Sequence, residues 1–231
     1  MNKEETVKNI FINLTADVCG IAGIERFKDA PEGFHPKDIY EKCESVIVFG
    51  KKMPLGSMLV NPRFIYLESM KLLLNELDKI ALLGGIKLEE LNGIGVPIPS
   101  DAPFEYWDEE QKEGRGLISL KHAAELAGLG KIGKNTLLFN KQYGNTLMFG
   151  CVLTNIKLAS DELFLHPFCP PKCRICIDNC PQEALNNIKI DQKKCREIIY
   201  GINKKGYSIC NCNKCRVLCP WTNGQRLRYM N

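Results

Sequence analysis

The chain has 231 residues, of which 45% are hydrophobic and 25% are charged, as is ordinary for a globular protein of one large domain or two small ones. Its longest apolar stretch, residues 70–83, is broken by charged and polar side chains. It therefore falls short of the ~18 apolar residues that a membrane span needs, which excludes a membrane-spanning protein. The net charge of +4 is unevenly distributed. Residues 1–168 contain 19 Lys/Arg and 23 Asp/Glu, whereas residues 169–231 contain 12 Lys/Arg and 4 Asp/Glu, so the basic excess lies at the C-terminal end.

Hydrophobic periodicity predicts the first elements of the chain. Residues 4–16 have the spacing of an amphipathic helix. Residues 45–50, Ser-Val-Ile-Val-Phe-Gly, form a short apolar run rich in β-branched side chains and are predicted as a buried strand. Residues 64–83 are predicted as a long helix that ends at Gly84 and Gly85.

The middle of the chain is richer in turn signals. Residues 95–103 contain three prolines and must be extended or turning. Residues 117–126 return to helical spacing. Residues 136–139 and 146–153 are predicted as a pair of strands joined through a turn at residues 143–145.

Nine of the twelve cysteines lie in the last third of the chain, and eight of them form two spaced runs with one cysteine between. The eight are Cys169, Cys173, Cys176 and Cys180 before Pro181, then Cys195, then Cys212, Cys215 and Cys219 before Pro220. Two copies of C-x2-C-x3-C-P resemble a bacterial two-cluster ferredoxin, in which the last cysteine of each run ligates the cluster of the other run. The spacing predicts two [4Fe-4S] clusters and an electron-transfer role.

The crossing of ligands has a geometric reason. Cysteines two residues apart share one tight loop, whereas the cysteine before proline begins a helix that points away. One cluster is therefore assigned to Cys169, Cys173, Cys176 and Cys219, and the other to Cys180, Cys195, Cys212 and Cys215. Two departures bear on the ligand set: three residues, not two, separate Cys169 from Cys173, and Cys210 is close enough to Cys212 to compete as a ligand.

Disulfides and zinc are the alternative uses of these cysteines. A disulfide framework belongs to secreted chains, and residues 1–9 are polar and charged, without the apolar run of a signal peptide. Paired C-x2-C units also build zinc sites, but zinc needs neither the third spaced cysteine nor the proline. Free thiols and clusters favour a cytoplasmic location.

A glycine segment at residues 128–133, Gly-Leu-Gly-Lys-Ile-Gly, matches G-x-G-x-x-G literally. Dinucleotide binding requires a strand before this motif and a helix after it. Here a helix is predicted before it and strand-like residues after it, so we reject the dinucleotide interpretation.

The same segment, Ala127 to Leu138, closely resembles the AGLG-x-IGKN-x-LL motif of epoxyqueuosine reductases, which are cobalamin-dependent iron–sulfur enzymes of tRNA modification and relatives of reductive dehalogenases. The eight cysteines are similar to the cluster ligands of that family in number and order, and the strand at residues 46–50 fits an early segment of it. The similarity is strong over residues 118–221 and faint before them.

The resemblance implies an α+β protein. An N-terminal α/β domain of nitroreductase-like topology, residues 1–165, would hold cobalamin or substrate, and a double-cluster ferredoxin-like domain, residues 166–231, would feed it electrons. Cofactor contacts are expected near the glycine segment, at Gly128, Gly130, Lys131, Gly133, Lys134 and Asn135. A low-potential donor of the ferredoxin or flavodoxin type would supply the electrons.

Two departures from the family pattern concern substrate and catalysis. The family's reductases are longer and continue into a helical repeat that helps to bind tRNA, so the length of this chain does not support a tRNA partner. The basic charge of the C-terminal end does not establish a tRNA partner either, because clusters with four thiolates are themselves anionic and would offset it. The family's catalytic aspartate would fall near Gly114, Arg115 and Gly116, and only Glu113 lies adjacent. The catalytic residues therefore stay unassigned.

Three functions follow from these observations: an iron–sulfur reductase that passes electrons to cobalamin or substrate, a plain electron carrier without a corrinoid, and a protein that reduces or delivers cobalamin. The short length and the absent aspartate favour the carrier. The retained glycine motif and the large companion domain favour the reductase.

Overall fold

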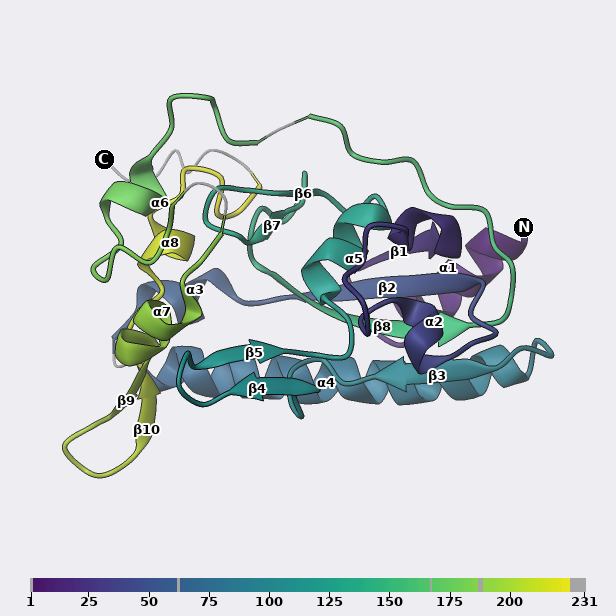
Figure 1. Ribbon diagram of the computed structural model, residues 1–231, viewed down its shortest axis with the longest axis horizontal. Coiled ribbons are helices and arrows are strands. Elements are labelled where there is room, and N and C mark those ends of the chain that lie inside the picture. Colours follow the sequence, from purple (N-terminus) through teal and green to yellow (C-terminus); the bar gives the residue numbers. More distant parts are fainter. Residues whose placement is uncertain (1, 62, 167, 187–188, 225–231) are drawn as a thin grey trace.

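The computed structural model describes residues 2–61, 63–166, 168–186 and 189–224, and a four-stranded antiparallel sheet forms the centre of this part of the chain (Figure 1). The strand order is β1 (Val18–Gly23), β2 (Ser45–Lys52), β8 (Leu147–Thr154) and β3 (Gly95–Ile98). The register pairs Ser45 with Thr154. The central strands β2 and β8 are buried along most of their length, as their continuous apolar sequence predicts.

Helices cover both faces of the sheet. Successive residues of β2 point to opposite sides, so Ile47 and Phe49 pack beneath α1 (Lys3–Asn13) and α4 (Phe64–Glu89). Val46 and Val48 belong to the opposite core, which α5 (Leu120–Leu126) covers. In this structure helices thus sandwich an antiparallel sheet, which corresponds to the α+β class.

The long helix α4 does not end at Gly84 and Gly85 as predicted, but continues to Glu89. Both glycines lie at close contacts. A Cβ at Gly84 would collide with the ring of Phe11, and one at Gly85 would lie 3.2 Å from the carbonyl oxygen of Gly95 in β3. The glycines therefore serve close packing of α4 against α1 and the sheet, a need that local sequence rules do not detect.

The predicted strand pair at residues 136–139 and 146–153 is wrong in its partners. Two short strands, β6 (Lys131–Ile132) and β7 (Leu138–Phe139), pair with each other. The second predicted strand is β8, which enters the main sheet between β2 and β3. The buried apolar run of β8 gains more by lying in the centre of the sheet than by forming a local hairpin.

The remaining elements are short and lie mostly in connections. They are η1 (Ile24–Phe27), α2 (Pro36–Ile39), α3 (Leu55–Leu59), β4 (Tyr106–Asp108), β5 (Glu113–Arg115), α6 (Ile175–Asp178), α7 (Gln192–Ile199), β9 (Tyr200–Ile202), β10 (Ser208–Cys210) and α8 (Lys214–Val217). The cysteine-rich elements α6, α7 and α8 gather at one end of the molecule (Figure 1). Among the described helices, none is both long and apolar enough to cross a membrane.

Candidate metal centres and the adjoining cleft

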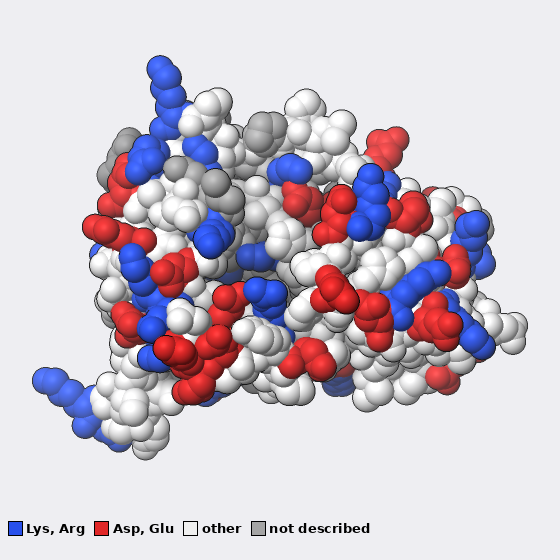
Figure 2. Space-filling view, viewed as in Figure 1, with Lys and Arg blue, Asp and Glu red and all other residues white. Residues whose placement is uncertain are grey.

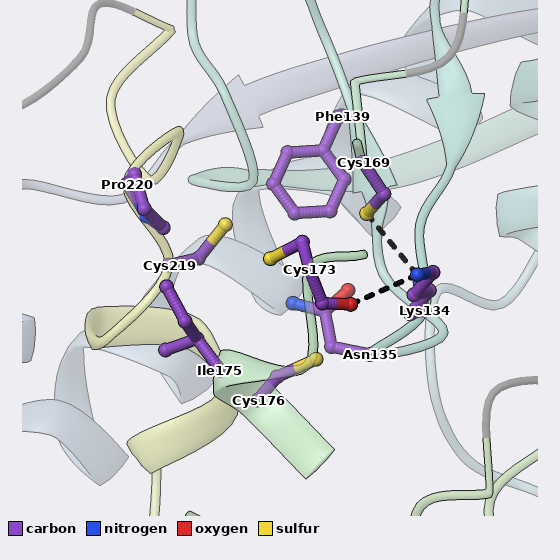
Figure 3. A pocket seen from close by; sticks show the side chains of 9 residues that line it. All are labelled: Lys134, Asn135, Phe139, Cys169, Cys173, Ile175, Cys176, Cys219 and Pro220. Carbon is purple, nitrogen blue, oxygen red and sulfur yellow. Dashed lines mark hydrogen bonds between the residues drawn. The ribbon is translucent and has the colours of Figure 1, made fainter. Parts of the chain in front are cut away.

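Four of the eight predicted ligands surround one cavity. Cys169, Cys173, Cys176 and Cys219 line it together with Phe139, and their sulfur atoms are shown in Figure 3. Cys173 and Cys176 come from one loop and the start of α6, whereas Cys219 arrives from the end of α8. This is the set that the crossed spacing assigned to the first cluster.

The thiols of this set act on one another electrostatically. The pKa of Cys219 is raised to about 12, mainly by burial and in part by the neighbouring Cys169, Cys176 and Cys173. Burial is also the main cause of the raised pKa of Cys176, followed by Cys169 and Cys173. The raised pKa values favour neutral thiols at Cys176 and Cys219, so binding of iron must displace their protons.

The other four ligands form a second neighbourhood. Burial raises the pKa of Cys195 in α7, and Cys212 and Cys180 add to it. Burial raises the pKa of Cys215 in α8 to about 12; Arg216 opposes this, and Cys195 and Cys212 reinforce it. The fold thus brings together residues from α7, α8 and two loops into the set expected for the second cluster.

Cys210 lies in an apolar cluster next to the second cysteine set. Its residue is 2% exposed and packs with Met53, Met58, Tyr66 and Leu67. Its Sγ donates to the backbone carbonyl of Cys212 at 3.5 Å. These contacts are those of a buried structural thiol.

The described thiols do not converge as the ligands of a single metal ion do. Among the described residues, no three His, Cys, Asp or Glu side chains form a group that could hold a single metal ion. A zinc site needs four ligands that converge at about 2.0–2.3 Å from one centre. The four thiols of the first set surround a cavity instead.

The glycine segment joins the cysteine loops to the sheet domain. The ammonium group of Lys134 donates to the carbonyl oxygens of Pro171 at 2.7 Å and Cys173 at 2.8 Å, and its backbone N–H reaches Cys169 Sγ at 3.5 Å (Figure 3). Asn135 is 2% exposed and donates to the carbonyl of Cys215 at 2.8 Å. Two neighbouring residues of the motif therefore hold loops of both cysteine sets.

The other predicted contact residues have different surroundings. Lys131 pairs with Glu125 at 2.7 Å. Gly128 and Gly130 have φ angles of +74° and +159°, and a Cβ on either would collide with a backbone carbonyl. A Cβ at Gly133 would lie 3.1 Å from Cys169 Sγ. The helix α5 precedes this segment, which confirms that the motif is not a dinucleotide loop.

A large cleft lies between the central sheet with its helices and the cysteine-rich end, with Lys and Arg side chains on its walls (Figure 2). Its volume is about 1410 Å³, above the roughly 300–1,000 Å³ of common small-molecule pockets. Lys121, Thr136 and Arg216 are among its lining residues. Of the described glycine-segment residues that were expected to contact a cofactor, Gly128, Gly130, Lys131, Gly133, Lys134 and Asn135, none is among those that line this cleft.

Sequence reasoning missed two residues of the cleft. The Oγ atom of Ser100 is buried and, within the described part of the chain, has no hydrogen-bond partner. Arg216 follows Cys215 directly and donates to the carbonyl of Asn145. Adjacency to a cysteine could have marked Arg216, but no sequence signal marks Ser100.

Residues 113–116, where the resemblance would put the family's catalytic aspartate, make contacts with α7 and with each other. Gly114 exchanges two hydrogen bonds with the side-chain amide of Gln192 in α7, at 3.1 and 3.2 Å. Glu113 lines the cleft and pairs with Arg115 at 2.9 Å. The carboxylate of Glu113 is therefore already engaged by a cation.

Comparison with known proteins confirms the resemblance. The epoxyqueuosine reductase of Atelocyanobacterium thalassa is 33% identical over 121 residues, which cover 46% of this chain and 38% of the relative. That of Aliivibrio fischeri is 29% identical over 211 residues, covering 83% of this chain and 52% of the relative. The chain thus spans about half the length, or less, of these curated relatives. No protein-family model matches the chain.

Solved structures show the same fold. The epoxyqueuosine reductase from Streptococcus thermophilus superposes with a TM-score of 0.65 at 17% identity, over 96% of this chain and 66% of that chain. A reductive dehalogenase whose structure suggests a mechanism for B12-dependent dehalogenation superposes with a TM-score of 0.72 at 17% identity. The superposition covers 95% of this chain and 31% of that chain. An epoxyqueuosine reductase bound to an epoxyqueuosine-modified tRNA-Tyr stem loop superposes with a TM-score of 0.61 at 15% identity. The superposition covers 97% of this chain and 66% of that chain.

Proposed function

We propose that the chain is an iron–sulfur oxidoreductase resembling epoxyqueuosine reductase, whose two [4Fe-4S] clusters supply electrons to an acceptor in the large cleft. The observation that carries this proposal is the position of Arg216. It follows Cys215 of the second cysteine set and also lines the cleft. A redox centre held by Cys215 would therefore lie close to whatever occupies the cleft.

In this proposal residues 166–231 are the cluster domain. Cys169, Cys173, Cys176 and Cys219 would hold one cluster, and Cys180, Cys195, Cys212 and Cys215 the other. Iron–sulfur clusters supply one-electron chemistry at potentials that hydrogen bonds and burial tune. The chain's own residues would orient the ligands. The Lys134 ammonium group donates a hydrogen bond to the backbone carbonyl of Cys173, and the Asn135 amide donates one to the backbone carbonyl of Cys215.

Residues 1–165 would form the cofactor and substrate domain, and the cleft has features that suit cobalamin. A corrinoid is a large ring with many amide arms, so it needs a wide cleft with free polar groups in its walls. The cleft volume of about 1410 Å³ meets the first need, and polar lining side chains such as Gln111, Lys121 and His122 meet the second. Bound cobalamin would supply a strongly reducing cobalt centre.

The cleft also argues against a plain electron carrier. A carrier needs exposed clusters and a docking surface, and gains nothing from a cleft of this size beside one cluster. The absent aspartate nevertheless separates this chain from its longer relatives, so a different proton donor or a different substrate is expected.

The test is anaerobic purification with analysis of iron, sulfide and corrinoid, followed by titration with hydroxocobalamin. We expect about eight irons per chain, as two four-iron clusters require, and a spectral change on addition of cobalamin. Zinc in place of iron would overturn the proposal. If the protein contains iron but its spectrum does not change on addition of cobalamin, the chain is a plain electron carrier.

A second experiment separates an enzyme from a cobalamin-handling protein. Because one similar structure holds a tRNA stem loop, we propose tRNA containing epoxyqueuosine as the first substrate to assay. Conversion to queuosine by the reduced, cobalamin-loaded protein would identify a reductase. Cobalamin reduction without any turnover of the tRNA would identify a cobalamin reductase or carrier.

A further inference from the structure

The hairpin of β9 and β10 projects from the cysteine-rich end of the molecule (Figure 1). It carries three large apolar side chains in solvent: Tyr200 is 59% exposed, Ile202 is 74% exposed and Tyr207 is 66% exposed. Single exposed apolar residues are common, but a group of them on one projecting element indicates a contact surface.

The charge of the hairpin has one sign. Between residues 198 and 213 the only charged side chains are Lys204 and Lys205, which form its tip. Figure 2 shows basic side chains that extend from this hairpin at the lower left. The wider segment 193–216 has seven Lys/Arg and one Asp/Glu. The surface is apolar on its sides and cationic at its end.

The hairpin is held rigidly at its tip and its base. The side chain of Asn203 accepts from the backbone N–H groups of Lys205 at 2.9 Å and Tyr207 at 3.0 Å. At the base, Cys210 is buried, and the guanidinium of Arg196 lies 5.6 Å from the ring centroid of Tyr200. The apolar side chains are thus presented by a fixed element, which lowers the entropy cost of binding a partner.

Both ends of the hairpin connect to the second cysteine set. Helix α7, which carries Cys195, runs directly into β9, and Cys212 follows two residues after Cys210 at the end of β10. Among the described residues that line the large cleft, none comes from residues 200–210. A partner on the hairpin would therefore lie beside the second set while the cleft stays open.

We propose that the β9–β10 hairpin is the docking surface for an acidic, low-potential redox protein of the flavodoxin or ferredoxin class. The inference rests on the proposed iron–sulfur function. Electron-transfer partners form small, transient interfaces that complementary charge steers, which matches an arm with a two-lysine tip. In each encounter the donor loses one electron and one cluster gains it, and no bond or proton is exchanged. An RNA substrate, in contrast, has to reach the cleft, which the hairpin does not line.

The test follows reduction of the clusters by stopped-flow absorbance, with fully reduced flavodoxin as the donor. The variant K204E/K205E is compared with the wild type and with K28E/K42E, which reverses two exposed lysines remote from both cysteine sets. At low salt we expect K204E/K205E to slow the second-order rate about tenfold or more, and K28E/K42E to change it little. At about 0.5 M salt the difference should largely vanish because the charges are screened.

A second variant and a second reductant make the result specific. Tyr207→Ser should slow reduction by flavodoxin at both low and high salt, since it removes apolar contact area and not charge. Dithionite, which needs no docking, should reduce all variants equally. If flavodoxin reduces wild type and K204E/K205E at equal rates, the docking proposal is overturned. It is also overturned if K204E/K205E loses only the ability to bind an RNA stem loop. Protein that contains neither iron nor sulfide after anaerobic purification would overturn the proposed function itself.

Discussion

At the scale of single residues, Cys210 and Cys212 show how little sequence distance says about environment. They are two positions apart, yet Cys210 is buried among Met53, Met58 and Tyr66, whereas Cys212 is half-buried. Spacing alone left both as ligand candidates. The burial of Cys210 at the end of β10 favours Cys212 as the ligand, which stays a prediction.

This difference gives a prediction on iron content. Cys212→Ala should lose about half of the iron, because one four-iron cluster would lack a ligand. Cys210→Ala should retain about eight irons and lose only stability, since it removes a buried side-chain atom. Iron and sulfide analysis of both anaerobically purified variants checks this. Loss of iron from Cys210→Ala alone would make Cys210 the ligand.

Arg216 is predicted to set the potential of the second cluster. Its positive charge beside Cys215 favours the added electron of the reduced state, so Arg216→Gln should make the potential more negative. Arg216→Lys keeps the charge and is the matched control. Potentiometric titration followed by electron paramagnetic resonance measures both, and identical potentials for wild type and Arg216→Gln would contradict the electrostatic role.

At the scale of elements, the glycine segment illustrates a motif whose surroundings the sequence did not reveal. The resemblance placed cofactor contacts at residues 128–135, and these contacts stay a prediction. The observed contacts of Lys134 and Asn135 are with the cysteine loops instead. The segment thus connects the sheet to both cysteine sets.

We therefore expect Asn135→Ala to destabilise the protein by about 1–3 kcal/mol, because a buried carbonyl of Cys215 would lose its donor. The control is Asn179→Ala. Asn179 is exposed, and its side chain bonds to the Ile175 carbonyl at 2.9 Å, so its loss should cost little. Thermal unfolding of the holo-proteins under anaerobic conditions compares the two. An equal effect of both changes would argue that the Asn135 bond is not important.

The extension of α4 through two glycines gives a second prediction at this scale. Gly84→Ala places a methyl group against the ring of Phe11 and should destabilise by about 1–3 kcal/mol through overpacking. Gly56→Ala in α3 has no atom within 4 Å of the new Cβ, so it should be neutral or stabilise by up to about 1 kcal/mol. Denaturant unfolding measures the difference, and a stabilising Gly84→Ala would show that α1 moves freely.

At the scale of the whole molecule, the two parts differ in what holds them together. The sheet has two apolar cores, on its two faces, built from α1, α4, α5 and the strands. The cysteine-rich end has short elements, α6, α7 and α8, and in α7 and α8 no residue is buried. Its order is therefore expected to depend on the clusters, as in other small metal-stabilised domains.

Removal of iron should accordingly affect the two parts unequally. Amide hydrogen exchange of holo-protein and chelator-treated protein should show faster exchange in residues 169–219, while β2 and β8 keep their protection. Uniformly faster exchange that includes β2 and β8 would show that the clusters hold the whole fold.

The sequence by itself determined the cysteine grouping, the buried strand β2 and the resemblance to epoxyqueuosine reductases. These features depend on local spacing and composition, which each short segment carries independently of the rest. Only the tertiary structure decided the partners of β8, the passage of α4 through Gly84, the burial of Cys210 and the cleft bordered by Ser100 and Arg216. Those outcomes depend on which distant surfaces meet, because packing of nonlocal side chains outweighs local conformational preference.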